Sequence, residues 1–393
     1  MKKIAILFLL LSTIPYINAQ QDSRVITTGV PFLLIAADAR AAGMADQGVA
    51  TSADAFSQQW NPAKYAFALD KQGFTASYTP YLTDLVNDIS LGQATYYNRI
   101  NERSAFAGSL RYFGLGEIEL RQNAEDQPQI VKPNELALDA SYSLKLSEKF
   151  AMAVSGRYIR SALRIPTGEG DAKPASSFAV DISGFYQGEE TALADFNGRL
   201  RLGFNFQNLG PKINYDAGSS DDNSANFLPA NMRLGGGYDF IFDEYNKVSV
   251  SLELAKLLVP TPQKLEDVNG DGEVDSIDQN IINTEYNKVN WVSGIFKSFN
   301  DAPGGFSEEL KEFTYSLGAE YLYQESFAMR LGYFHESPEK GARQFFSLGA
   351  GFKYNVVKVD VSYLFSASKV KNPLENTLRF SLTFSFGDKY EEY

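Results

Sequence analysis

The chain has 393 residues and a formal net charge of −12, which argues against a nucleic acid as its partner. It contains no cysteine, and this excludes disulfide bonds and thiol chemistry. Its 22 Tyr and 29 Phe against only 2 Trp suit the aromatic girdles of a membrane barrel, although the core of a soluble sandwich could also hold many aromatic side chains.

The first residues have the layout of a secretory signal peptide. A basic start at Lys2 and Lys3 precedes an apolar run from Ile4 to Leu11, and a cleavage site of small residues follows near Ala19. The apolar run is shorter than the roughly 20 residues that a spanning helix needs. We therefore predict that residues 1–19 direct export. Because no later window is so apolar, a membrane location would require a β-barrel.

Residues 20–71 differ from the rest of the chain and predict a short, partly helical plug, or hatch, inside or beneath a barrel. An Ala-rich stretch at 36–45 predicts one helix, and residues 53–59 predict a second. Ser52 is the expected cap of the second helix, and Asn61 followed by proline is expected to end it.

From residue 73 onward, segments of about ten residues alternate between apolar and polar side chains. This period of two is typical of strands with one face in oil and the other in water. Fourteen segments show it, an even number as bacterial barrels require. They are residues 73–81, 89–98, 104–116, 135–146, 150–162, 177–187, 199–208, 231–241, 247–258, 312–324, 327–335, 344–354, 356–366 and 376–386.

The connections distinguish a membrane barrel from a soluble sandwich. Short turns alternate with long loops, and short periplasmic turns opposite long exterior loops are typical of an outer-membrane barrel. The longest connection is 259–311. We predict an all-β fold: a transmembrane antiparallel barrel of about 14 strands over residues 72–393, in contact with outer-membrane lipid.

Residues 32–67, which read FLLIAADARAAGMADQGVATSADAFSQQWNPAKYAF, contain the most specific pattern in the chain. This run resembles the N-terminal signature of the PorV/PorQ family, outer-membrane components of the type IX secretion system that are related to FadL-type transporters. Length and the exported start favour the PorV branch. The residues that carry the resemblance best are Asp38, Arg40, Gly43, Trp60, Asn61 and Pro62. Ala37 and Ala45 depart from the pattern, in place of Pro and Gly.

The resemblance implies a FadL-like barrel in the outer membrane of a Gram-negative bacterium, and it leaves two functions open. One is a non-enzymatic secretion component that docks on the large type IX translocon barrel, binds the C-terminal signal domains of cargo and carries cargo to the attachment-complex proteins. The other is a passive transporter of hydrophobic small molecules. A barrel alone fits either function.

The connection 259–311 contains a pattern of oxygen donors typical of calcium loops. Donors at positions 1, 3 and 5, glycine at position 6 and a carboxylate at position 12 reproduce the spacing of EF-hand and dockerin-type sites. A solvated acidic loop is the alternative. The predicted Ca²⁺ ligands are Asp267, Asn269, Asp271, Glu273 and Asp278.

No catalytic site is predicted. His335 is the only histidine, and its neighbours Glu336 and Ser337 diverge from it in a strand or turn, whereas the members of a triad must converge. The loops are a better candidate for function, because recognition usually sits on loops carried by a rigid scaffold. The apolar loop residues proposed to bind a partner are Phe227, Leu228, Phe296, Phe299 and Phe306.

Overall fold

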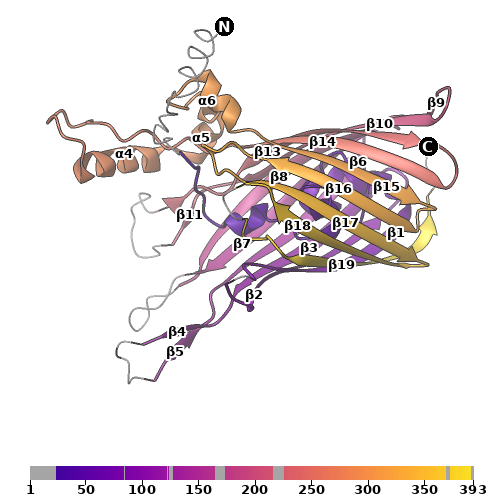
Figure 1. Ribbon diagram of the computed structural model, residues 1–393, viewed down its shortest axis with the longest axis horizontal. Helices are drawn as coiled ribbons and strands as arrows, with labels where there is room; N and C mark the ends of the chain where they lie inside the picture. Colours follow the sequence, from indigo (N-terminus) through magenta and orange to yellow (C-terminus); the bar gives the residue numbers. More distant parts are fainter. Residues whose placement is uncertain are drawn as a thin grey trace, which may run out of the picture.

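The computed structural model describes residues 24–83, 85–121, 123, 127–163, 173–215, 225–368 and 372–390, so the expected signal peptide at 1–19 lies outside the described residues. Fourteen long strands form an antiparallel barrel (Figure 1). They are β1 (Asp70–Pro80), β2 (Ile89–Arg99), β3 (Ser104–Leu115), β6 (Asn134–Lys145), β7 (Phe150–Ala162), β8 (Ala175–Gln187), β10 (Asn197–Leu209), β13 (Asn231–Ile241), β14 (Asn246–Leu257), β15 (Thr314–Tyr323), β16 (Phe327–His335), β17 (Gln344–Tyr354), β18 (Val357–Ser366) and β19 (Leu378–Lys389).

The barrel is closed, because each long strand pairs with two neighbours. The first strand, β1, pairs with the last, β19, and β10 pairs with β13 across the longer connection between them. Register shifts occur only near two strand ends in these ladders, at Asp70 to Gln72 and at Phe206 to Leu209. All fourteen predicted strands are confirmed, with ends that differ by a few residues.

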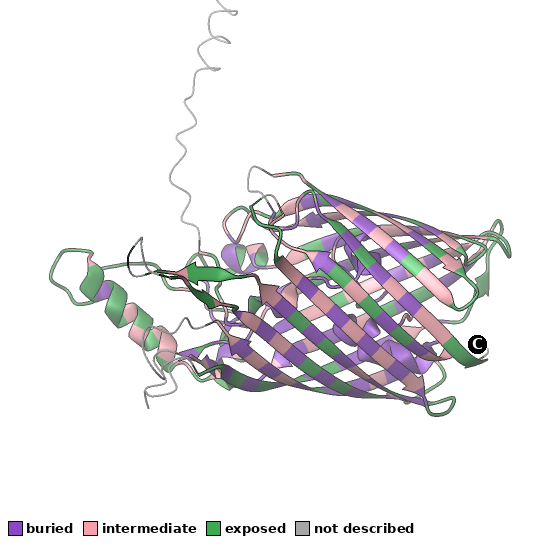
Figure 2. Ribbon diagram, turned by 90° about the horizontal axis from the view of Figure 1, so that it is seen from below, coloured by how far each residue is buried: buried purple, intermediate pink, exposed green. Residues whose placement is uncertain are grey.

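The wall alternates as the sequence predicts, with apolar side chains outside and polar side chains inside. In β19, Leu378 and Phe380 are about half exposed, whereas Arg379 and Ser381 are buried. Figure 2 shows the same alternation as bands of buried and exposed residues along the strands. Exposed apolar side chains on this outer face are what a lipid-facing wall requires.

The two ends of the barrel differ in the length of their connections. Tight turns such as 100–103 and 324–326 join strands at one end, and β9 (Thr191–Ala192) extends the turn before β10. Longer connections lie at the other end, and two of them form small hairpins. These hairpins are β4 (Ile118–Leu120) with β5 (Gln129–Val131), and β11 (Ile213–Asn214) with β12 (Ala225–Asn226).

The hatch lies inside the barrel and is built from four short helical turns. These are η1 (Pro31–Leu34), α2 (Ala39–Ala42), α3 (Ser57–Trp60) and η2 (Pro62–Phe67). Both predicted helices are shorter than expected: 36–45 contains only α2 and 53–59 only the start of α3. Ser52 was expected to cap the second helix, but its hydroxyl accepts a hydrogen bond from Arg40 instead.

The hatch enters the lumen at the long-loop end and leaves at the turn end. At its start, the backbone N–H of Arg24 donates to the carbonyl of Glu339 in the connection between β16 and β17. At its end, Leu69 accepts a hydrogen bond from Tyr390, and β1 begins at Asp70. In Figure 1 the indigo segment accordingly runs down the axis of the barrel.

The longest connection, between β14 and β15, carries three helices outside the barrel. They are α4 (Ser276–Lys288), α5 (Trp291–Lys297) and α6 (Phe306–Lys311), and α4 projects away from the wall (Figure 1). Within the described residues, no helix has the length and apolarity to cross a membrane.

Candidate functional site

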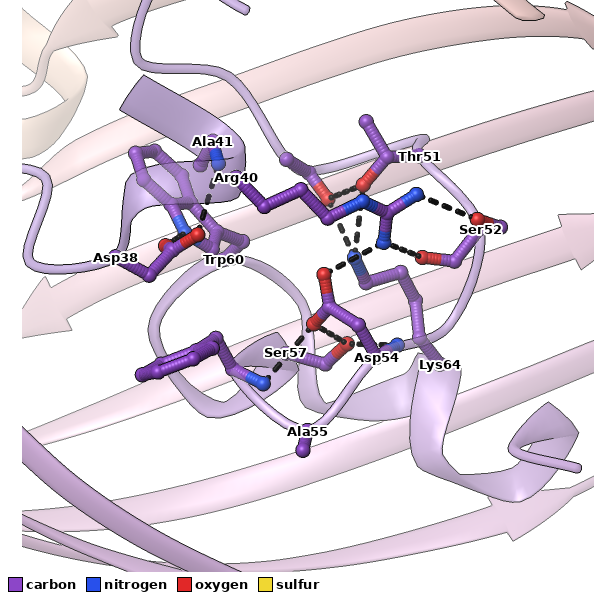
Figure 3. A network of polar contacts seen from close by, with 12 residues as sticks. Asp38, Arg40, Ala41, Thr51, Ser52, Asp54, Ala55, Ser57, Trp60 and Lys64 are labelled. Atoms are coloured by element: carbon purple, nitrogen blue, oxygen red, sulfur yellow. Dashed lines mark hydrogen bonds and ion pairs between the residues drawn. The ribbon is translucent and has the colours of Figure 1, made fainter. Parts of the chain in front are cut away.

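Arg40 joins a strand of the wall to another part of the hatch. Its guanidinium donates to both carboxylate oxygens of Glu320 on β15, at 2.8 and 3.1 Å. Within the hatch it donates to the carboxylate of Asp54 at 2.7 Å, and Figure 3 shows Arg40 among its partners in the hatch. It also donates to the hydroxyl and carbonyl oxygens of Ser52. An arginine of the hatch is therefore in direct contact with a glutamate of the wall.

The charges around Arg40 are mutually compensated, as buried charges must be. Burial alone would raise the pKa of Asp54, but the positive charges of Lys64 and Arg40 outweigh burial and lower the pKa to about 2. Burial lowers the pKa of Lys64 to about 8, and its ammonium group donates to the carbonyl of Gly48 and the hydroxyl of Thr51. A segment held by so many polar contacts has a defined position.

Asp38 stabilises the start of the hatch in two ways. One carboxylate oxygen caps α2 by accepting from the N–H of Ala41 at 2.8 Å, and the other accepts from the indole N–H of Trp60 at 2.7 Å. Burial, together with the charge of Asp54, raises the pKa of Asp38 to about 6. Asp38 therefore ties two hatch helices together.

Trp60, Asn61 and Pro62 also have structural contacts. The ring of Trp60 is buried and lies under the guanidinium of Arg233, 5.0 Å from its centroid. The side-chain amide of Asn61 donates to the carbonyls of Val49 and Gly184, and Pro62 begins η2. Every residue that carries the family resemblance thus lies within the buried hatch.

Glycines on the inner face of the wall allow the hatch backbone to approach it. A Cβ added at Gly203 would lie 2.1 Å from the carbonyl oxygen of Val49, and one added at Gly332 would lie 2.3 Å from the nitrogen of Ala45. A Cβ on Gly349 would meet the Cα of Gly43 at 3.1 Å. These contacts explain why the wall carries glycine at positions where a strand usually prefers a larger residue.

A second polar cluster, which the sequence did not reveal, fixes α6 at the mouth of the barrel. Glu308 accepts from Arg24 at 2.5 Å and from Lys340 at 2.7 Å. Glu312 accepts from Lys340 at 2.8 Å and also pairs with Lys256 on β14. Arg24 and Glu308 are 284 positions apart, and no local pattern links them. We call these five residues the mouth cluster.

Two cavities lie on either side of the hatch, and no residue lines both. The larger one, about 470 Å³, is at the mouth and is lined by residues 25–28, by wall residues such as Arg233 and Ala255, and by Phe334. The smaller one, about 190 Å³, is at the turn end and is lined by Arg40, Asp54 and Glu320 among others. The hatch therefore lies between the two cavities.

Four of the predicted calcium ligands lie in the exposed part of the connection before α4, and the fifth, Asp278, is buried in the first turn of α4. Gly272 has a φ of +88°, as a sharp turn at position 6 would require. Asp278, however, caps α4 together with Asp275, and its carboxylate accepts from the N–H groups of Val268 and Asn269. Among the described residues, no three acidic or histidine side chains gather as a metal site. Calcium binding stays a prediction.

The five residues proposed to bind a partner fall into two groups. Phe296, Phe299 and Phe306 are exposed on α5, the following turn and α6. Phe227 and Leu228 are buried, and Phe227 packs edge-on against Tyr286 of α4. Leu228 belongs to a buried cluster with Val30 and Phe32 of the hatch. These two side chains are therefore packed inside this structure, and partner binding by the five residues stays a prediction.

His335 and its neighbours do not converge. The ring of His335 stacks on Tyr315, with 4.6 Å between the centroids, whereas Glu336 pairs with Arg343 at 2.8 Å. The two side chains thus have separate structural partners.

The closed ladder, the apolar outer face and the two unequal ends define an outer-membrane β-barrel. The family model described as "Type IX secretion system protein PorV" matches residues 18–264, more than half of the chain. The chain belongs to the PorV family.

Solved structures of FadL-like proteins share the barrel. The toluene transporter TodX of P. putida is 11% identical with a TM-score of 0.52, and the match covers 90% of this chain and 98% of TodX. A Pseudomonas aeruginosa FadL homologue is 13% identical with a TM-score of 0.44, and that match covers 93% of this chain and all of the homologue. The likeness to TodX shows a common fold. No curated protein matches the chain in sequence.

Proposed function

We propose that the protein is a non-enzymatic component of the type IX secretion system in a Gram-negative outer membrane. It docks on the large translocon barrel, binds the C-terminal domains of exported cargo and passes cargo to the attachment-complex proteins. The observation that carries this proposal is the family match over residues 18–264, which includes the whole hatch.

Two features of the structure support a role in binding other proteins rather than in transporting small molecules. The hatch fills the middle of the lumen and is fixed to the wall by Arg40, Asn61 and the glycine contacts. The exterior connection, in contrast, exposes Phe296 and Phe306 at about three-quarters of their surface. Large exposed apolar side chains on an exterior loop are typical of a surface that binds another protein.

The alternative, a FadL-like passive transporter of hydrophobic molecules, is favoured by the mouth cavity of about 470 Å³, which could hold a small ligand. Such a ligand would still have to pass the hatch or cross the wall. The ladders between neighbouring long strands run without a register shift except at Asp70 to Gln72 and at Phe206 to Leu209, and beyond the second shift β10 pairs with β8 only at Val180.

Deletion of the gene distinguishes the two functions. Loss of a secretion component should retain exported proteins with a common C-terminal domain in the periplasm, and the tagged protein should copurify with a very large outer-membrane barrel. Phe296→Ser with Phe306→Ser should reduce that copurification while leaving barrel stability unchanged, because both side chains are exposed. An unchanged secreted proteome together with loss of hydrophobe uptake would favour the transporter.

A further inference from the structure

Residues Val25 to Thr28 lie at the mouth of the barrel, outside any helix or strand, and their backbone has no hydrogen-bond partner among the described residues. No N–H or C=O group of these four residues forms a hydrogen bond with another described residue. Their exposure alternates, with Val25 and Thr27 exposed and Ile26 and Thr28 half-buried. A segment with this geometry and with free backbone groups is a template for another strand.

Both ends of this segment are fixed in place. The N–H of Arg24 donates to the carbonyl of Glu339 at 3.1 Å, and the guanidinium of Arg24 pairs with Glu308 of the mouth cluster. At the other end, the N–H of Gly29 donates to the carbonyl of Phe227 at 2.9 Å. A segment already held at both ends loses less conformational entropy when it pairs with a partner than a free one would.

The mouth cavity of about 470 Å³ lies beside the segment and offers room for a second chain. The charged side chains that line it are mostly paired with one another, for example Arg233 with Glu253 and Arg343 with Glu336. The side-chain oxygen of Asn231 also lines the cavity, is buried and has no partner among the described residues. The groups left to bind a ligand are therefore neutral hydrogen-bonding groups, mainly those of the backbone.

We propose that Val25–Thr28 is a strand-addition site that binds an extended polypeptide segment in the mouth cavity. A polypeptide strand carries N–H and C=O groups at the spacing of the segment, so it can satisfy both kinds of group. An acyl chain or aromatic hydrocarbon could fill the same volume but would leave the backbone groups unpaired. The inference rests on the proposed function, because exported cargo would supply the strand.

Hydrogen exchange on the mature full-length protein in lipid nanodiscs tests this site. The probes are the isolated C-terminal domain of an exported substrate and, for comparison, oleate. We expect the amides of Ile26 and Thr28, which point to the same edge of the segment, to exchange rapidly alone and at least about tenfold more slowly with the domain, since backbone pairing protects an amide. Oleate should leave their exchange unchanged. Protection by oleate, or binding of the domain without protection here, would overturn the proposal.

Proline substitutions provide matched variants. Ile26→Pro and Thr28→Pro each remove one N–H that has no internal partner, and proline tolerates an extended backbone, so the fold should be kept. Each should weaken binding of the domain by about tenfold, whereas Ile26→Ala and Thr28→Ala should change it by less than about threefold. Equal binding by the proline variants would contradict strand addition while leaving the secretion function intact.

Failure of the wild-type protein to bind any cargo domain, with normal secretion after gene deletion, would remove the proposed function itself.

Discussion

The hatch lies inside the barrel and the exterior connection between β14 and β15 lies outside it, and neither is part of the wall. The two segments differ in which kind of side chain they bury. The hatch buries charged residues such as Arg40 and Lys64 and satisfies them with wall and hatch partners. The exterior connection exposes apolar residues such as Phe296 and Phe306. Burying charge is costly unless it is fully paired, and exposing aromatic rings gains nothing in the isolated molecule. The buried part of the hatch is therefore structural, and the exposed connection is a candidate for contacts, as is the start of the hatch at the mouth.

The largest effect should come from blocking the close approach of hatch and wall. In Gly332→Val and Gly203→Val the added side chain would meet hatch backbone, at 2.3 and 2.1 Å for the Cβ alone. Backbone cannot rotate away, so we expect a loss of at least about 3 kcal/mol, at the upper end of overpacking costs. The chain has no cysteine, and Ser57 of the hatch is buried in wild type. The rate at which maleimide labels the thiol introduced by Ser57→Cys therefore reports how far the hatch is exposed.

The matched control is Gly156→Val on β7, where an added Cβ meets nothing within 4 Å. When Gly156→Val is combined with Ser57→Cys, maleimide labelling should stay as slow as in the protein that carries Ser57→Cys alone. Slow labelling in all three valine variants would mean that the contacts at Gly332 and Gly203 do not limit how the hatch is seated.

A smaller but still large effect is expected from the ion pair between hatch and wall. Arg40→Met removes the partner that reaches both oxygens of Glu320, but Arg330 still donates to one of them at 2.6 Å. We therefore expect a loss of about 1–3 kcal/mol, as for a buried acceptor that loses one partner. Exchange of hatch amides should accelerate accordingly. Lys149→Met, which breaks an exposed pair with Glu189 at 2.8 Å, should change stability by less than about 1 kcal/mol. Similar exchange in both variants would contradict the distinction between hatch and surface.

The wall was predictable from sequence because strand alternation is local, and each strand repeats it. Asp38 and Trp60 were also found in advance, but only as members of a family pattern; their hydrogen bond joins residues 22 positions apart. The mouth cluster could not be found, because Arg24, Glu308 and Lys340 come from segments that meet only after the barrel closes. The two hatch helices were predicted too long, since lumenal packing and the turn after α2, where Ala45 has a φ of +64°, interrupt them.

The anchored end of the exterior connection should loosen at low pH. Hydrogen bonds from Arg24, with those from Lys340, lower the pKa of Glu308 from 4.5 to about 2. A lowered folded-state pKa means that the contribution to stability is complete above pH 4.5 and is lost as the pH falls toward 2. Protection factors of α6 amides, corrected for intrinsic rates, should therefore fall between pH 5 and 2.5. Burial alone would raise the pKa of Glu312, but hydrogen bonds from Lys256 and Lys340 outweigh burial and lower this pKa as well. Glu308→Gln should therefore weaken this dependence without abolishing it, and an unchanged dependence in that variant would assign it to another group.

The smallest effect concerns calcium in the exposed half of the same connection. Two of the predicted ligands are already engaged: Asp267 accepts from the N–H groups of Gly270 and Gly272, and Asp278 caps α4. An ion would replace these hydrogen bonds rather than fill an unsatisfied site, so its net gain is reduced. We still expect millimolar Ca²⁺ to slow proteolysis within 259–311, and Asp271→Ala to abolish the slowing. Equal cleavage of wild type with calcium and with chelator would identify the segment as a solvated acidic loop. It would leave α6, fixed by Glu308 and Glu312, as the ordered part of the connection.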